Sequence, residues 1–124
     1  MALDVTLLRG EPVAPKKRRR MTRSQRRVAG PETVAWLSAA GAAALEDLTD
    51  DELLMTGLPV LMGWHPFGRT HTLRGRQLYD LLEDLARLAA RPDLSRESAD
   101  VVVELQVLAQ RAIDEDLILT VDPD

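Results

Sequence analysis

The pattern of apolar residues predicts a first helix after Gly30-Pro31. Proline suits the first helical position, because its missing N–H would have no partner there. From that point apolar or small residues recur at spacings of three and four, as they do along a helix that buries one face. They are Val34, Leu37, Gly41, Leu45 and Leu48. We therefore expect one helix from about residue 31 to residue 48.

The next stretch, residues 50–64, is expected to hold two short helical pieces. Thr49 and Glu52 have the spacing of a capping box, in which the threonine accepts a hydrogen bond from a helix amide and the glutamate reaches back to the cap. Gly57-Leu58-Pro59 interrupts the pattern, since glycine and proline favour a kink or a turn.

Two longer helices follow. Thr72 is a candidate cap for the third helix, and Glu83 and Arg87 are spaced to pair on its outer side. The apolar set of this helix is Leu78, Leu81, Leu82, Leu85, Leu88 and Ala89. Asp93 or Ser95 opens the fourth helix. Its stripe is Val101, Leu105, Leu108 and Ala112, although Val101-Val102-Val103 also favours a strand. The short connection implies that these two helices are antiparallel neighbours.

Both termini alternate apolar and polar residues, which is typical of strands. Leu3, Val5 and Leu7 do so near one end, and residues 117–121 are β-leaning near the other. They are candidates for a small two-stranded ribbon, which would be marginally stable alone. The resulting expectation is a mainly α fold, a small bundle of about four helices with short terminal strands. Residues 1–29 would form an extended N-terminal segment and residues 30–124 an acidic helical domain.

Charge divides the chain in the same way. Residues 1–27 contain nine basic and two acidic side chains, a formal +7, whereas residues 28–124 contain seven and eighteen, a formal −11. A run so rich in like charges repels itself, so we expect it to be extended or disordered when free. The basic run is Lys16, Lys17, Arg18, Arg19, Arg20, Arg23, Arg26 and Arg27.

We interpret this run as a polyanion-binding arm. Nucleic-acid phosphate is the leading partner, bound without reading bases, because the run has no interleaved aromatic residues on which bases could stack. A solvated non-specific tail, an acidic protein surface and a membrane surface are the alternatives.

A second group of cations interrupts the acidic part of the chain. Residues 64–77 carry no carboxylate, and two arginines flank a glycine at the expected start of the third helix, where the helix dipole disfavours cations. Because arginines and a glycine are unfavourable at a helix start, their presence indicates a second site, for an anion or a partner's carboxylates. The residues are His65, Arg69, His71, Arg74 and Arg76. The alternative is that these arginines pair with the acidic faces of neighbouring helices within the chain.

Nothing in the sequence indicates catalysis. His65 and His71 lack the i,i+4 spacing of a helical metal pair, and neither a nucleophile elbow nor a phosphate-binding loop is present. The absence of cysteine excludes disulfides and thiolate chemistry and favours a cytoplasmic location. No apolar run approaches the roughly 18 residues of a membrane span. We expect no catalytic residues, metal or cofactor.

Two functions are compatible with these features. The first is a non-enzymatic adaptor whose basic arm binds nucleic acid while its acidic body contacts protein partners. The second is a structural subunit of a multi-chain assembly such as a phage particle, with the arm and termini threading across acidic neighbours and the protein located within the virion. The sequence does not determine the oligomeric state.

Overall fold

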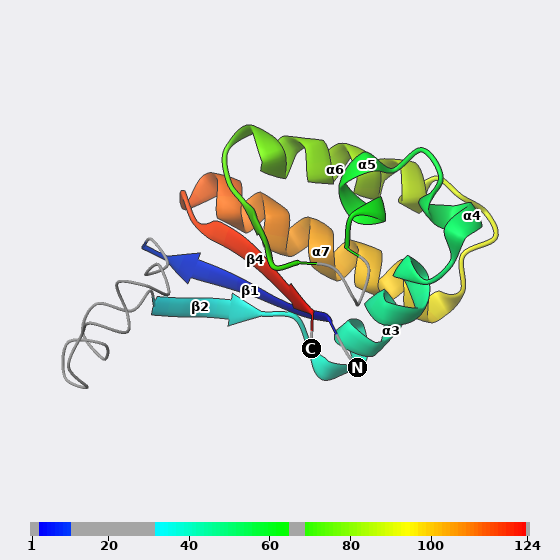
Figure 1. Cartoon of the computed structure of the whole chain (residues 1–124), viewed down its shortest axis with the longest axis horizontal. Coiled ribbons are helices and arrows are strands. Elements are labelled where there is room, and N and C mark those ends of the chain that lie inside the picture. The colour runs from blue at the N-terminus through cyan, green and yellow to red at the C-terminus, as the bar shows by residue number, and fades with distance from the viewer. Residues whose placement is uncertain (1–2, 11–31, 65–68, 124) are drawn as a thin grey trace.

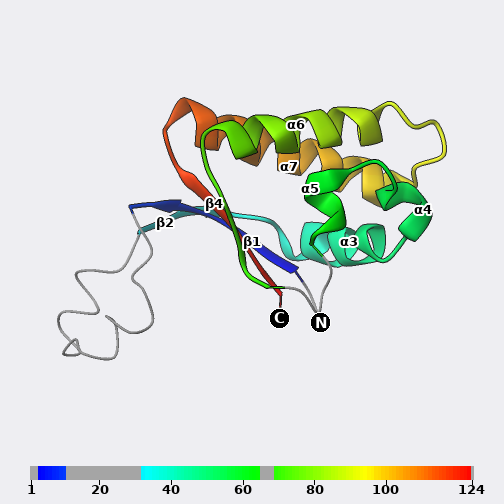
Figure 2. The ribbon, with the colours of Figure 1, turned by 45° about the horizontal axis from the view of Figure 1, so that its top comes forward.

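A computed structural model describes residues 3–10, 32–64 and 69–123, and in them the fold is mixed α/β. An antiparallel sheet of four strands is covered on one face by helices (Figure 1). The turned view in Figure 2 shows the sheet on one side and α6 and α7 on the other. The expectation of a mainly α, all-helical bundle is therefore wrong.

The sheet has the strand order β2-β1-β4-β3. The central strands are β1 (Leu3–Arg9) and β4 (Ile118–Pro123), which pair antiparallel along their lengths. This confirms the predicted pairing of the two termini. The two edge strands were not predicted, and they supply the extra ladders that a two-stranded ribbon lacks. Leu3, Val5 and Leu7 point to the buried face of the sheet.

The predicted first helix is two elements. Residues Glu32–Trp36 form edge strand β2, and helix α3 begins only at Ala39 and ends at Thr49. Val34 and Leu37 match helical spacing, but Thr33, Val34 and Trp36 are β-branched or aromatic and fit a strand equally well. Pairing with β1 decides the conformation, and Ser38 caps the helix by accepting a hydrogen bond from the Gly41 amide.

The two short helical pieces are confirmed as α4 (Glu52–Met55) and α5 (Pro59–Met62). The predicted capping box of Thr49 and Glu52 is wrong. Asp51 caps α4 by accepting hydrogen bonds from the amides of Leu53 and Leu54. The Thr49 hydroxyl instead donates to the Glu46 carbonyl within α3.

The third helix begins later than expected. Thr72 lies in β3 (His71–Leu73), the second edge strand, and α6 spans Arg76–Ala89. Gly75 precedes the helix with a φ of 57°, a conformation that glycine adopts without strain. The predicted stripe is mostly buried, and α6 packs against α7 and α5.

Helix α7 (Arg96–Asp114) matches its prediction closely. Ser95 is the cap, its hydroxyl accepting from the Ser98 amide, and the residues of the predicted stripe are all buried. This helix contacts α6, α3 and β4, so it links the helical layer to the sheet.

One buried carboxylate replaces the predicted Glu83 to Arg87 pair. Asp84, only 1% exposed, accepts hydrogen bonds from the amides of Val60 and Leu61 at the start of α5, at 2.8 and 3.2 Å. Arg87 lies 3.6 Å from the same carboxylate. Helix α6 therefore holds the first turn of α5 in place.

Candidate polyanion interface

The basic run itself lies outside the described residues, but the structure places both ends of the segment that contains it. Strand β1 ends at Arg9, strand β2 begins at Glu32, and these two residues face each other in the sheet. Residues 11–31 therefore connect neighbouring strands. All eight basic residues of the run belong to a connection whose two ends are held side by side at one end of the sheet, and not to a tail with one free end.

Two further arginines lie at this end of the sheet and share one carboxylate. Arg9 lies 3.6 Å from Glu115, at the end of α7. The Nε atom of Arg111 donates to the other oxygen of Glu115 at 2.6 Å. Glu115 therefore ties the last residue of β1 to the last turn of α7, next to the point where the basic connection begins.

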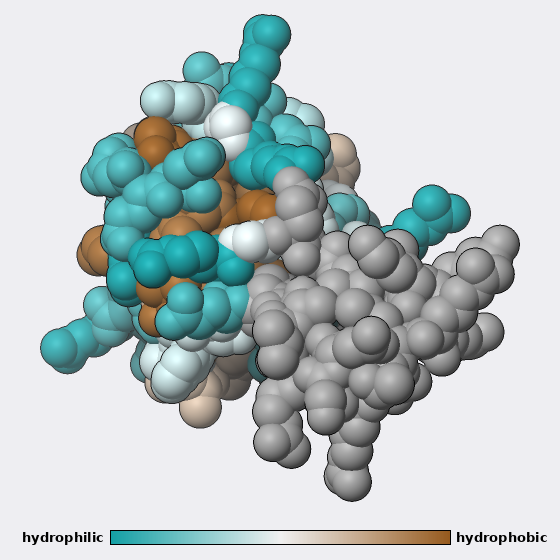
Figure 3. Space-filling view, turned by 90° about the vertical axis from the view of Figure 1, so that its left-hand side faces the viewer, coloured by the Kyte–Doolittle hydropathy of each residue, from teal (hydrophilic) through white to brown (hydrophobic). Residues whose placement is uncertain are grey.

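Arg74 follows edge strand β3 and also lies near the point where the basic connection begins. A surface hollow of about 220 Å³ is lined by Gly10, Arg74, Asp116, Leu117 and Ile118. Arg74 thus borders the first residue after β1, where the basic connection leaves the body. Figure 3 faces this end of the molecule and shows hydrophilic residues projecting around a smaller apolar area.

The described residues at this end carry charges of both signs, and those of the turn from α3 to α4 carry negative charge alone. Four arginines stand near four carboxylates at this end, whereas the turn from α3 to α4, at the opposite end in Figure 1, is acidic. The acidic residues of that turn are Asp47, Asp50, Asp51 and Glu52. The four arginines are Arg9, Arg74, Arg76 and Arg111, and the four carboxylates are Glu32, Asp114, Glu115 and Asp116.

The structure divides the second predicted site. Arg69 and Arg74 lie at opposite ends of β3, about 16 Å apart at 3.3 Å per extended residue. Arg76 is the first residue of α6, close in the chain to Arg74. The two arginines of the helix start thus join the end of the sheet that carries the basic connection, and Arg69 does not.

His71 does not add to this interface. His71 is half-buried opposite Val121, and its Nε2 atom is buried without a hydrogen-bond partner among the described residues. His65 lies outside the part of the chain that the structure describes. Thr70, the residue after Arg69, donates a hydrogen bond from its hydroxyl to Asp122 at 2.8 Å. The start of β3 therefore lies beside an acidic residue.

Sequence reasoning missed Arg9 and Arg111. Both are isolated cations in their local sequence, so no run or motif marks them. They come together only because β1 pairs with β2 and β4, and because α7 ends where β4 begins.

The described surface at this end of the sheet is made largely of charged side chains. Among residues 3–10, 32–64 and 69–123, no three His, Cys, Asp or Glu side chains are grouped to hold a metal ion. In that same part of the chain, none of the helices is long and apolar enough to cross a membrane. Comparisons with protein-family models, with curated proteins and with solved structures found no match.

Proposed function

We propose that the protein is a non-enzymatic adaptor. Its basic connection between β1 and β2 binds nucleic-acid phosphate without reading bases, and its acidic α/β body contacts protein partners. The observation that carries this proposal is the pairing of Arg9 with Glu32, which holds both ends of the connection against a packed sheet. Arg74 stands beside the start of the connection and adds a cation from the body.

Anchoring both ends favours binding for a physical reason. A chain closed at both ends has fewer free conformations than a tail, so it loses less entropy when a partner orders it. The acidic body repels phosphate, so a polyanion is confined to the end of the sheet where the basic connection begins. An adaptor needs this separation, because its two partners must not compete for one surface.

The test is a binding titration against duplex DNA and RNA over a range of salt. Truncating residues 1–27 is unsuitable, because it removes β1 from the middle of the sheet. The better variant replaces residues 10–31 by Asn-Gly, a two-residue turn that suits the directly opposed Arg9 and Glu32. A second variant keeps the length and changes the eight basic residues of the run to glutamine.

The intact chain should bind with an affinity that falls steeply as salt rises. If all eight cations contact phosphate on duplex DNA, the slope of log K against log salt is about −7. Both variants should lose this binding while staying folded. An intact chain that ignores nucleic acid at low salt would contradict the proposal and favour a subunit of a multi-chain assembly.

A further inference from the structure

The geometry points to a docking site for an acidic protein segment at the opposite end of the molecule from the basic connection. The site is the hollow between α4 and the C-terminal half of α6, and its occupant is a partner peptide that carries one large apolar side chain flanked by carboxylates. This inference rests on the protein-binding half of the proposed function and specifies the surface that performs it.

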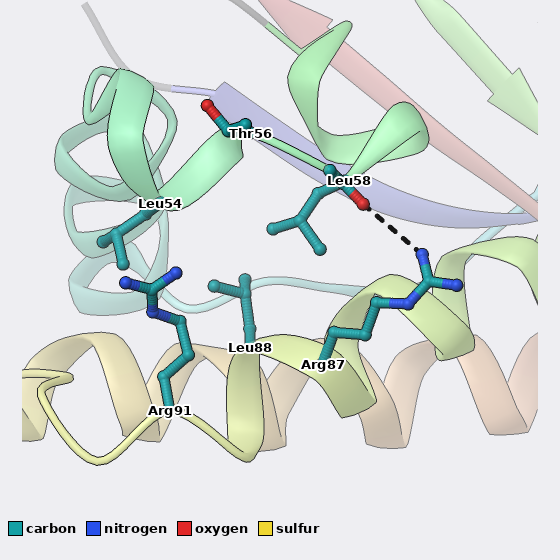
Figure 4. Close-up of a pocket in the computed structure, with 7 residues that line it drawn as sticks. Leu54, Thr56, Leu58, Arg87, Leu88 and Arg91 are labelled. Carbon is teal, nitrogen blue, oxygen red and sulfur yellow. Dashed lines mark hydrogen bonds between the residues drawn. The ribbon is translucent and has the colours of Figure 1, made fainter.

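The hollow has an apolar wall. Leu54 from α4, Leu58 from the turn before α5 and Leu88 from α6 line a space of about 290 Å³. Figure 4 shows Leu58 and Leu88 pointing toward each other, with Leu54 to one side of them. A space of this size is at the lower end of the range for ligand pockets and suits one anchoring side chain of a larger partner. Leu53, the residue before Leu54 in α4, is 82% exposed.

Two arginines border this wall, Arg87 in the last turn of α6 and Arg91 just after the end of that helix. Arg87 donates to the Gly57 carbonyl at 3.4 Å, and Arg91 extends toward Leu54 on the other side of Leu88 (Figure 4). Their side chains are 58% and 40% exposed. Each is paired within the chain through a single nitrogen: Arg87 with Asp84 at 3.6 Å, and Arg91 with Asp93 at 3.3 Å. A guanidinium carries five N–H donors, so both groups keep donors for a second carboxylate.

Charge identifies the occupant. The residues that line the hollow include Arg87 and Arg91 and no carboxylate, although the acidic turn from α3 to α4 lies next to it in the chain. Residues 28–124 carry a formal −11, so an acidic peptide is repelled by most of the body, this turn included, and is attracted only where the two arginines border the hollow. A nucleic acid fits this place poorly, because two cations beside leucines offer little phosphate neutralisation. Acidic residues with a central apolar anchor complement both the leucines and the arginines.

The test uses a synthetic probe and site-resolved detection. The probe is the blocked peptide Glu-Glu-Leu-Glu-Glu, titrated into the isotope-labelled full chain and followed through the methyl signals of Leu54, Leu58 and Leu88. Because the peptide also meets the basic connection, the titration is repeated on the full-length variant whose eight basic residues are glutamine. Shifts at the hollow should persist in that variant. Nucleic-acid binding should not, so the two proposals fail separately.

Three substitutions give the expected directions. Arg91→Glu should weaken binding at the hollow by about tenfold or more, because it replaces attraction by repulsion. The matched control is Arg96→Glu, the same charge change at the exposed first residue of α7 and outside the hollow, and it should leave binding unchanged. Asp93→Asn should tighten binding by up to about fivefold, because it removes the carboxylate that competes for Arg91.

Specific results would overturn the inference. Equal binding of Glu-Glu-Ser-Glu-Glu would show that the hollow takes no apolar anchor. Equal effects of Arg91→Glu and Arg96→Glu would show that only net charge matters. Shifts confined to the basic connection, or an absence of shifts at the three leucines, would show that the hollow is ordinary surface packing.

Discussion

The carboxylate of Glu104 on α7 lies where the side chain of Gly41 on α3 would be. A Cβ atom added to Gly41 would be 2.7 Å from Glu104 Oε2, closer than such atoms approach. From this position the carboxylate accepts hydrogen bonds from the amide and the hydroxyl of Ser38, at 2.7 and 3.0 Å. Gly41, the third residue of α3, therefore leaves room for α7 to bind the start of that helix.

The first prediction concerns this contact. Gly41→Ala should destabilise the protein by about 1 kcal/mol, because displacing Glu104 loses a charge-assisted hydrogen bond to Ser38, and the gain in helix propensity in the first turn is smaller than the roughly 1 kcal/mol of a helix interior. Unfolding in urea measures the change. In a Glu104→Ala background the 2.7 Å contact is gone and only the side chains of Leu37 and Ser38, each 3.0 Å from the added Cβ, remain, so the same substitution should cost less. Additive effects in this double-mutant cycle would show that the two residues do not interact.

The second prediction concerns the buried carboxylate of α6. Asp84→Ala should cost about 2 to 3 kcal/mol, because it leaves two amides at the start of α5 without their charged acceptor. Hydrogen exchange at the Val60 and Leu61 amides should accelerate most. Asp80→Ala, on the exposed side of the same helix, is the control and should change stability little.

The third prediction tests the fold through its two tryptophans. Trp36 is 68% exposed on edge strand β2, whereas Trp64 is 1% exposed in the core. Acrylamide should quench one part of the emission readily and leave a blue-shifted part protected. Trp36→Phe should remove the quenchable part alone. If the protected part disappears instead, the assignment of β2 to the surface is wrong.

The fourth prediction concerns the N-terminal residues. Removal of residues 1–27 should abolish folding, because β1 lies between β2 and β4 and carries buried Leu3, Val5 and Leu7. Replacing residues 10–31 by Asn-Gly should preserve the folded state. Circular dichroism and thermal unfolding compare the two. A truncated chain with a normal melting transition would contradict the sheet order.

The fifth prediction is a pH dependence. A hydrogen bond from Arg91, with a further one from its own backbone, lowers the pKa of Asp93 below its ordinary value. A depressed pKa means that the pair contributes stability above the unfolded-state pKa, about 3.9, and that this contribution is lost as pH falls through the lower folded value. The carboxyl titration followed by NMR should move toward the ordinary value in Arg91→Gln and stay unchanged in Arg96→Gln. The effect on unfolding is small, because Asp93 is exposed to solvent.

The sequence alone predicted those elements whose conformation depends on residues close together in the chain. Helix α7 has a serine cap and a four-residue buried stripe within one continuous segment, and both were predicted. The break at Gly57 depends on glycine and proline, whose backbone preferences act at their own positions. The alternation in β1 and β4 likewise shows which side chains of each strand face the core.

Pairing between distant segments decided the rest. Residues 32–36 satisfy the spacing of a helix and the composition of a strand, and only the neighbouring β1 selects the strand. Strand β3 is three residues long, too short to show a period, and exists because β4 offers a free edge. The sequence alone determined that eight cations lie in one run. The tertiary structure decided that both ends of the segment containing them are anchored, because strand pairing is a contact between residues that the chain places far apart.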